Sequence, residues 1–308
     1  MGSEVRLTAW VTDPRMTETA FEEAFDEFDR LDRLMSVWKP GSDVERLNAA
    51  AGQHPVSISS EVLDTLQLAG QVSEWTDGKF DVTFGALSGL WKFDHDQDNQ
   101  IPPRSEIEAR LPLVDYQALI VDPRAATAFL RKAGMRVHLG GIGKGYAVDR
   151  AAAILRARGL RDFMIQSGGD LYAAGGHGNR PWRAGIKDPR GDGDRIFAAL
   201  DLRDSTFSTS GDYERFFLRD GRRYHHILDP DAGEPARGCR SVTIVARGAA
   251  LADALSTGVF VAGPDAGMKL VERLPDVDAV IVTDRNEVLV SSGLTARLER
   301  LASPTDGP

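Results

Sequence analysis

The stretch His138-Leu-Gly-Gly-Ile-Gly-Lys-Gly-Tyr-Ala-Val-Asp-Arg150 places four glycines within six positions. Apolar, strand-like residues at 135, 137 and 139 lead into it, and an alanine-rich helical pattern follows as far as Gly159. This order predicts a strand, an open loop and a helix. Glycine has no side chain to collide with a ligand, and the first N–H groups of a helix are free, so such a loop suits an anion.

Two familiar phosphate-binding motifs do not fit this loop. The dinucleotide fingerprint needs a glycine at the sixth position counted from Gly141, where Tyr146 stands. The P-loop needs Ser or Thr after Lys144, where Gly145 stands. Taken alone, the stretch is therefore more typical of a tight strand-to-helix turn than of an anion site.

Composition indicates an ordinary globular protein. The chain has 308 residues, 42% of them hydrophobic and 27% charged, and a net charge of −9. That charge argues against a nucleic-acid partner, and no apolar run approaches the ~20 residues of a membrane helix. Cys239 is the only cysteine, which excludes an internal disulfide and a cysteine-based metal cluster.

No basic-then-apolar leader is visible at the N-terminus. As written, the sequence predicts a cytoplasmic protein. If an N-terminal leader has been removed, the same chain fits the periplasm or a membrane surface.

Hydrophobic periodicity divides the chain into a largely helical first part and a strand-rich second part. A long amphipathic helix is expected to begin at the capping box Thr19-x-x-Glu22 and to stop before Pro40. Further helices are expected at residues 42–52, 59–77, 105–111, 249–261 and 264–274. Residues 78–85 form a short segment rich in β-forming residues. Strands are expected at 5–11, 119–121, 127–130, 163–166, 171–174, 182–186, 197–202, 206–209, 213–218, 224–227, 241–246, 279–282 and 288–291.

This pattern predicts an α+β fold of mostly antiparallel sheets flanked by helices. No low-complexity linker or repeat divides the chain, so a single compact unit over residues 1–302 is expected. Residues 303–308 are expected to form a flexible C-terminal tail.

Asp253 and Thr257 lie four residues apart in a predicted helix, which puts both side chains on one face. A carboxylate and a hydroxyl suit a hard cation such as Mg²⁺, which usually takes few protein ligands and completes its shell with phosphate and water. Alternatively, Asp253 forms a cap or salt bridge and Thr257 bonds to its own helix.

Three other stretches carry polar groups that could line a ligand site. His226, in a strand that leads into Asp229-Pro230, is a candidate base or ligand donor, and His225 should point to the opposite face. The turns Ser167-Gly-Gly-Asp170 and Ser208-Thr-Ser-Gly-Asp-Tyr213 offer hydroxyls and backbone N–H groups. Each of these stretches alone is equally typical of a structural residue or turn.

In their order along the chain, these stretches resemble the ApbE family of Mg²⁺-dependent FAD:protein FMN transferases. The resemblance covers nearly the whole chain, beginning with Met1-Gly2-Ser3 where the family has Met-Gly-Thr. Eight further stretches carry it: residues 35–38 with 42–48, 78–87 with Trp91, 140–149, 167–170, 182–183, 208–213, 226–233 and 253–257.

The resemblance implies a reaction and its participants. A Thr or Ser hydroxyl of a partner flavoprotein attacks FAD at the FMN-side phosphorus, AMP leaves, and FMN stays attached through a phosphoester. The family pattern implies that Mg²⁺ is held by Asp253, Thr257 and the main-chain carbonyl of Gly143. Asp253 and His226 are the candidate catalytic bases, and the resemblance does not choose between them.

The resemblance also implies which residues contact FAD. Most lie in glycine-rich or hydroxyl-rich turns, and Trp38 offers an aromatic surface suited to the flavin ring. They are Met1, Trp38, Asn48, Gly78, Phe80, Asp81, Thr83, Gly141, Lys144, Asp149, Ser167, Gly168, Gly169, Asp170, Ser208, Thr209, Ser210, Gly211 and His226.

Two alternatives use the same site. One is an FAD pyrophosphatase, in which water replaces the acceptor hydroxyl and FMN and AMP are released. The other is an FAD-binding protein without turnover, against which the presence of both Asp253 and Thr257 argues, because binding alone does not require a metal at the pyrophosphate.

Overall fold

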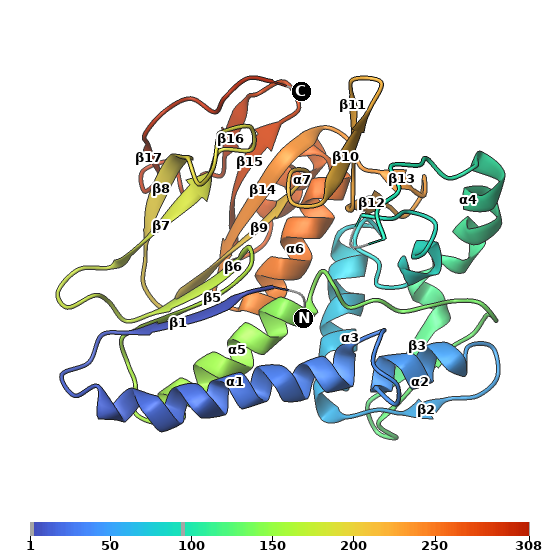
Figure 1. Cartoon of the computed structure of the whole chain (residues 1–308), viewed down its shortest axis with the longest axis horizontal. Helices are drawn as coiled ribbons and strands as arrows, with labels where there is room; N and C mark the ends of the chain where they lie inside the picture. The colour runs from blue at the N-terminus through green and yellow to red at the C-terminus, as the bar shows by residue number, and fades with distance from the viewer. Residues whose placement is uncertain (1–2, 94–95, 308) are drawn as a thin grey trace.

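The computed structural model describes residues 3–93 and 96–307. Its largest element is a twisted sheet in which every neighbouring pair of strands is antiparallel (Figure 1). In spatial order the strands are β1 (Val5–Ala9), β5 (Phe163–Ser167), β6 (Asp170–Ala174), β9 (Ser205–Gly211), β14 (Cys239–Ala246), β15 (Asp278–Thr283) and β16 (Val288–Val290). Successive side chains in these strands face opposite sides of the sheet, and both sides are covered.

Helices cover one side of this sheet (Figure 1). They are α1 (Arg15–Met35), α3 (Ser60–Trp75), α5 (Gly143–Ala157), α6 (Ala249–Ala262) and α7 (Pro264–Val271), with the shorter α2 (Asp43–Ala49) and α4 (Arg104–Arg110) further out. Helix α6 packs against β9, β14, α3, α5 and α7, so it is apolar and buried on nearly all sides. A polar side chain on α6 is consequently enclosed by protein.

A smaller sheet covers the other side. Its order is β17-β8-β7, and Trp182, Phe197 and Leu200 pack from it against Phe207 and Val280 of the large sheet. Its strands are β7 (Trp182–Lys187), β8 (Ile196–Leu202) and β17 (Glu299–Arg300). The remaining strands form small pairs and a triplet: β2 (Val56–Ser57), β3 (Leu119–Asp122), β4 (Thr127–Leu130), β10 (Phe216–Arg219), β11 (Arg222–His225), β12 (Leu228–Asp229) and β13 (Glu234–Pro235).

The predicted class is confirmed: this is one compact α+β unit with mostly antiparallel sheets and flanking helices. In the part of the chain that the structure describes, no helix is both long and apolar enough to cross a membrane. The helices expected to begin near residues 42 and 59 are present, and the Ser42 and Ser59 side chains cap them, since each accepts a hydrogen bond from the N–H group three residues later.

Two local predictions were wrong. Thr19 does not begin a helix, because α1 starts at Arg15, after Pro14, and Asp13 accepts a hydrogen bond from the Arg15 N–H. Residues 135–139 are extended but join no sheet. Arg136 forms only an isolated parallel bridge with Phe84, and the His138 N–H donates to the carbonyl of Val82. On the other side the Asn48 side chain bonds both to the N–H and to the carbonyl of Val137.

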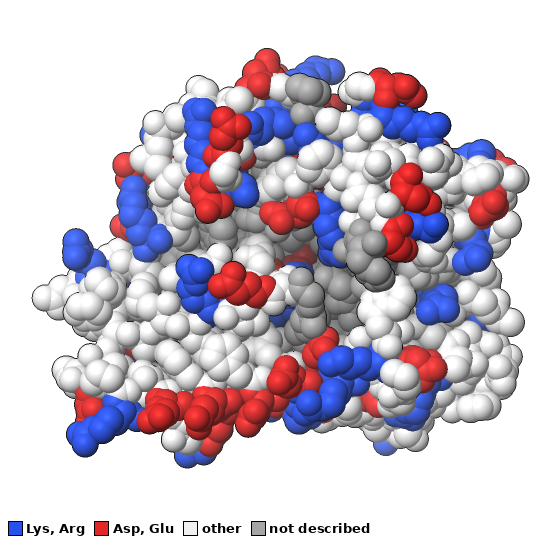
Figure 2. Space-filling model, in the orientation of Figure 1, with Lys and Arg blue, Asp and Glu red and all other residues white. Residues whose placement is uncertain are grey.

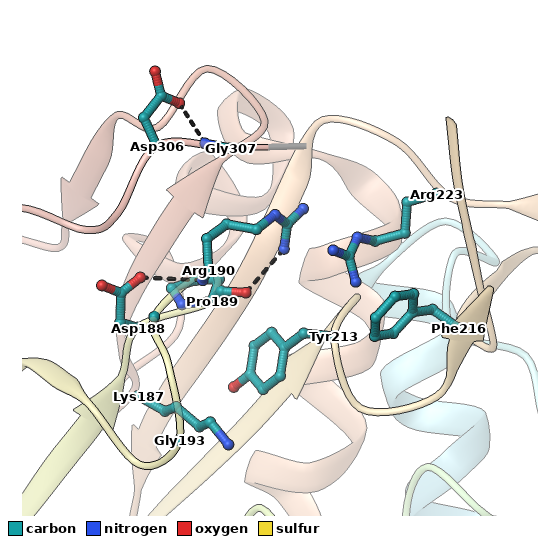
Figure 3. Close-up of a pocket in the computed structure, with 11 residues that line it drawn as sticks. Lys187, Asp188, Pro189, Arg190, Gly193, Tyr213, Phe216, Arg223, Asp306 and Gly307 are labelled. Atoms are coloured by element: carbon teal, nitrogen blue, oxygen red, sulfur yellow. Dashed lines mark hydrogen bonds between the residues drawn. The ribbon is translucent and has the colours of Figure 1, made fainter. Parts of the chain in front are cut away.

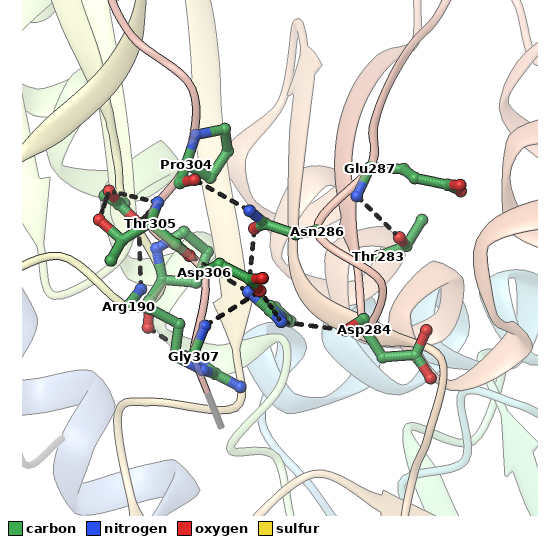
Figure 4. A network of polar contacts seen from close by, with 12 residues as sticks. Arg190, Thr283, Asp284, Asn286, Glu287, Pro304, Thr305, Asp306 and Gly307 are labelled. Carbon is green, nitrogen blue, oxygen red and sulfur yellow. Dashed lines mark hydrogen bonds and ion pairs between the residues drawn. The ribbon is translucent and has the colours of Figure 1, made fainter.

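Residues 304–307, within the segment expected to be a flexible tail, make specific contacts (Figure 4). The Asp188 carboxylate accepts bonds from the N–H and the hydroxyl of Thr305. Arg240 donates to the carbonyl of Thr305 and to Asp306, and Asn286 donates to the carbonyl of Pro304. These bonds hold the segment against β7, β14 and the turn before β16.

Candidate functional site

The glycine loop has a different shape from the predicted one. Only Gly140 and Gly141 precede α5, whereas Gly143 and Gly145 belong to its first turn. A Cβ atom at Gly145 would lie 2.2 Å from the carbonyl oxygen of Ala249, so this glycine permits α5 to cross the start of α6. A Cβ at Gly141 would lie 3.3 Å from the Thr257 hydroxyl oxygen. Gly141 is therefore the position where the loop backbone meets α6.

Helix α6 contributes the carboxylate and hydroxyl that the sequence pointed to. Asp253 Oδ2 accepts a hydrogen bond of 3.0 Å from the Gly145 N–H. One turn further, the Thr257 hydroxyl lies 3.2 Å from that of Ser210 on β9. Gly141 therefore lies beside Thr257, and Gly145 bonds to Asp253. Gly143 lies between these two glycines in sequence.

Lys144 lies between two carboxylates. Its Nζ atom is 3.1 and 3.2 Å from the two oxygens of Asp253 and 3.2 Å from Asp170 Oδ2. Burial and the nearby charge of Asp170 raise the pKa of Asp253 to about 7, although Lys144 opposes this. Burial lowers the pKa of Lys144, but the charges of Asp170 and Asp253 outweigh it and hold that pKa above its usual value. The cluster holds one ammonium group against two carboxylates.

The serine-rich turns line the same face of the large sheet. Ser167, Asp170 and Ser208 are directly paired across β5, β6 and β9, so their side chains share that face. Ser208 donates its hydroxyl hydrogen to Asp170, and the Ser210 hydroxyl lies 2.8 Å from that of Ser256. The buried Ser167 hydroxyl has no hydrogen-bond partner among the described residues, which leaves it available to a ligand.

Gly168 and Gly169, in the turn between β5 and β6, make backbone contacts. Gly168 adopts a positive φ of 58° and donates its N–H to the Glu4 carbonyl, and a Cβ there would meet Ser3. The Gly169 carbonyl accepts a bond from the Thr209 N–H. The Thr209 hydroxyl lies 2.9 Å from that of Thr243, on the opposite face of the sheet from Ser208. Its side chain is therefore directed away from the Lys144 cluster.

Several predicted FAD contacts have internal partners. Both oxygens of Asp149 accept bonds from backbone N–H groups at the start of α6, those of Ala249 and Ala250. Asp81 accepts bonds from Thr83 and from the Tyr116 N–H, and burial raises the pKa of Asp81 to about 6. These carboxylates fix the scaffold of the site.

Other residues that were predicted to contact FAD lie around the edge of the site. Phe80 is buried against Gly141, while Trp38 is 77% exposed on the chain after α1. The remaining glycines pack beside aromatic rings, Gly78 near Tyr116 and Gly211 against Tyr213. Met1 lies outside the described residues.

The expected strand over residues 224–227 ends earlier: His225 is the last residue of β11, and His226 follows it in a bend with different surroundings. His225 is buried, with its ring nitrogens bonded to the carbonyl of Ala236 and the N–H of Ile227, and burial lowers its pKa to about 4. The Nδ1 atom of His226 is enclosed and has no hydrogen-bond partner in the described residues. Burial and the charges of Arg215 and His225 lower the pKa of His226 to about 3, with a smaller contribution from Lys144. His226 is neutral at physiological pH.

Sequence reasoning missed two features of this region. Ser256, which bonds to Ser210, lies within the quoted stretch 252–260, and its three-residue spacing from Asp253 could have indicated it. Arg190 and Asp212 form a bidentate pair at 2.7 Å just beyond β9, with side chains only 9% and 8% exposed. Twenty-two residues separate them, and no local pattern predicts their contact.

The donor set suits a hard cation better than a soft one. Residues 3–93 and 96–307 contain no group of three His, Cys, Asp or Glu side chains arranged to hold a metal. The predicted set is instead one carboxylate, one hydroxyl and one carbonyl, which leaves room for phosphate and water around Mg²⁺. The Lys144 cluster has two carboxylates and one ammonium group, so a bound cation would compensate its excess negative charge.

In this α+β fold a glycine loop faces a buried carboxylate and a half-buried hydroxyl. Such a site defines a class of protein suited to bind a phosphorylated ligand together with a cation. Among solved structures, the ApbE protein from Thermotoga maritima superposes with a TM-score of 0.86 at 37% identity, covering 97% of this chain and 96% of that one. The flavin transferase ApbE from Vibrio cholerae also has a TM-score of 0.86, at 27% identity and 96% coverage of each chain.

The sequence comparisons agree. An FAD:protein FMN transferase of Klebsiella pneumoniae (strain 342) is 33% identical over 304 residues, covering 98% of this chain and 93% of the relative. One from Treponema pallidum (strain Nichols) is also 33% identical, covering 92% of this chain and 82% of its own. The ApbE family matches residues 1–281. This chain belongs to the ApbE family, which confirms the resemblance seen in its motifs.

Proposed function

We propose that this protein is an FAD:protein FMN transferase that attaches FMN to a Thr or Ser hydroxyl of a partner flavoprotein. The observation that carries the proposal is the pair formed by the buried Asp253 and the half-buried Thr257 on α6, which faces the glycine loop beside a cluster with two carboxylates and one ammonium group. Family membership supplies the substrate class, since the matched relatives are named for FMN transfer from FAD.

The reaction breaks the phosphoanhydride bond of the FAD pyrophosphate and forms a phosphoester bond. The acceptor oxygen bonds to the FMN-side phosphorus of FAD, and the bond from that phosphorus to the bridging oxygen breaks. AMP leaves with the bridging oxygen, and the hydroxyl proton passes to a base. Asp253, Thr257 and the Gly143 carbonyl would hold Mg²⁺, which when bound neutralises charge on the pyrophosphate.

The protein's own groups have separate tasks. The hydroxyls of Ser167, Ser208 and Ser210 offer hydrogen bonds on the sheet side of the site, and Lys144 offers a positive charge to the phosphates. Two groups are candidates to accept the proton. His226 is neutral and its Nδ1 atom has no hydrogen-bond partner among the described residues, and Asp253 has a pKa raised to about 7.

The test is incubation with FAD, Mg²⁺ and a threonine-containing peptide of the kind that the family modifies, followed by mass analysis. A gain of the mass of FMN on the peptide, with release of AMP, is expected. FMN and AMP free in solution with an unchanged peptide would replace transfer by hydrolysis. FAD that stays bound and intact would leave only a flavin-binding protein.

A further inference from the structure

The C-terminal strap, which we define as residues 304–307, is bonded to two buried side chains (Figure 4). The Asp188 carboxylate accepts a hydrogen bond of 2.7 Å from the Thr305 hydroxyl and one of 2.9 Å from the Thr305 N–H. The Arg240 guanidinium donates to the carbonyl of Thr305 and to Asp306, each at 3.2 Å. A buried charge is costly without partners, so the strap supplies part of the compensation that Asp188 and Arg240 need.

The residues that hold the strap also hold Asp212, the first residue after β9. The Asp188 carboxylate accepts a bond of 3.1 Å from the Arg190 N–H, and the Arg190 guanidinium forms two bonds of 2.7 Å with the Asp212 carboxylate. On a second route, the Arg240 carbonyl accepts a bond of 3.0 Å from the Asp212 N–H. The strap is therefore linked to the Asp212 side chain through Asp188 and Arg190, and to its backbone through Arg240.

Asp212 begins the short segment, residues 212–215, that leads from β9 to the backbone partner of His226. Strand β9 itself carries Ser210 of the candidate site. At the other end of the segment, the Arg215 carbonyl accepts a bond of 3.1 Å from the His226 N–H. A displacement of Asp212 would consequently shift the carbonyl to which the His226 backbone is bonded.

A hollow of about 460 Å³ lies where the strap meets this segment. Asp306 and Gly307 of the strap line it, as does Tyr213 of the segment (Figure 3). Side chains of both signs line it as well, Asp188 and Arg190 among them. Figure 2 shows such a mixture of signs over the upper part of the molecule, in contrast to the acidic row along α1 at its lower edge. Several charges of the hollow bond to one another or to the strap, so the hollow belongs to the contact between strap and segment.

We propose that the strap positions His226 for FMN transfer, with Thr305 as the positioning residue. The inference rests on the proposed function, because it gives the strap a task in that reaction. Thr305 acts through the bonds that hold Asp212, and these bonds limit how far the Arg215 carbonyl can move. A base must lie within hydrogen-bond reach of the proton that it accepts, so a loss of order at His226 lowers the fraction of molecules in reactive geometry.

The first test is backbone hydrogen exchange, followed by mass analysis of fragments, and it needs no turnover. Thr305→Pro removes the hydroxyl and the N–H from which Asp188 accepts bonds, because proline has no N–H group. We expect the amides of residues 212–226 to exchange at least about tenfold faster in this variant, as for the loss of one or two hydrogen bonds. Thr305→Ala removes only the hydroxyl and should increase the exchange rate less.

Thr295→Ala is the matched control for the exchange measurement. The Thr295 hydroxyl donates to the Ser291 carbonyl at 3.1 Å in the turn after β16, outside the strap. Its removal should leave exchange over residues 212–226 unchanged. The thermal midpoint of each variant reports whether it is folded.

The second test measures FMN transfer to the acceptor peptide. In Thr305→Pro the kcat should fall about tenfold, while the KM for FAD changes less than about twofold. The reason is that, within the described residues, the strap bonds to no residue predicted to contact FAD. A general loss of structure would instead raise the KM for FAD and lower the thermal midpoint.

Three results overturn the inference: exchange over residues 212–226 that both Thr305 variants leave unchanged, an unchanged kcat in a variant whose exchange is faster, and a KM for FAD that rises as kcat falls. If Thr305→Pro does not fold, Thr305→Ala carries both measurements. Failure of the proposed function is distinct from all three. In that case the unaltered protein transfers no FMN, and the exchange comparison still shows whether the strap orders His226.

Discussion

Two buried charge clusters flank strand β9, and they differ in how their charges balance. Beside Ser208, Lys144 meets Asp170 and Asp253, one cation against two anions. Just after Gly211, Arg190 meets Asp212 alone, with two parallel bonds of 2.7 Å. The first cluster is incomplete without a further positive charge or a proton, whereas the second is complete.

The Lys144 cluster therefore has the charge balance of a ligand site, whereas the Arg190–Asp212 pair is a structural contact, which we call the clamp. Burial of a charge is costly unless a partner compensates it, so a protein that keeps an uncompensated carboxylate inside gives up stability in the metal-free state. The clamp gives up little, and it fixes the segment that carries Tyr213 and Arg215 toward His226. The following experiments measure how far the two clusters differ.

The largest effect is expected from Asp253→Ala. We expect FMN transfer to fall at least about a thousandfold and to lose its dependence on Mg²⁺, since the variant removes the charged ligand of the cation. Mass analysis of the acceptor peptide over a Mg²⁺ series measures both. Asp194→Ala, at a fully exposed carboxylate, is the control. Full activity of Asp253→Ala would refute the metal assignment.

The clamp should behave in the opposite way. Asp212→Asn leaves Arg190 buried without its counter-charge, and we expect unfolding free energy to fall by about 3–5 kcal/mol. Asp253→Asn instead leaves one carboxylate per ammonium in the Lys144 cluster, so the metal-free protein should be as stable as before or more stable. Urea unfolding without metal compares the two. Equal destabilisation by both variants would remove the distinction between site and clamp.

Lowering the pH should reduce the free energy of unfolding through His225, which interacts with Asp212 of the clamp. Its folded-state pKa of about 4 lies below the ordinary value of 6.5, so from pH 6.5 down to about 4 the unfolded chain binds a proton that the native protein does not. Stability is then lost as pH falls, by about 1.4 kcal/mol per pH unit for this one group. Urea unfolding at several pH values tests this: His225→Asn should flatten the slope, and an unchanged slope would contradict the assignment.

The smallest effect is expected from Lys144→Gln. The ammonium group lies within 3.2 Å of both carboxylates and competes electrostatically with an incoming cation. Removing it should lower the Mg²⁺ concentration that half-saturates the metal-free protein by up to about tenfold. Calorimetric titration with Mg²⁺ and no FAD measures this. Weaker Mg²⁺ binding in the variant would show that Lys144 supports the cation instead of competing with it.

Local patterns predicted the parts of the site that depend on neighbours in sequence. The four-residue spacing of Asp253 and Thr257 put them on one face of α6, and helices were expected to begin near residues 42 and 59, where α2 and α3 begin. Alternation along β9 accounts for Ser208 and Ser210 facing the site while Thr209 faces away, although all three were expected to contact FAD.

What could not be predicted depends on how distant segments cross. Lys144 reaches Asp253 because Gly145 allows α5 to approach Ala249, and no spacing rule contains that contact. Asp149 was expected at the ligand, but its oxygens bond to N–H groups one hundred residues later. Residues 135–139 were expected to form a strand because their side chains alternate, yet they pair only through an isolated bridge from Arg136 to Phe84 and through the Asn48 side chain.

The bonds from Asp149 to the start of α6 also bear on how the protein is made. A ribosome adds about 5–20 residues per second, so roughly 5 to 20 s pass between the synthesis of α5 and that of α6. During that interval the Asp149 carboxylate lacks the N–H groups that it accepts from, and Lys144 can meet Asp170 but not yet Asp253. The site is thus completed late in translation, after most of the sheet that surrounds it has been synthesised.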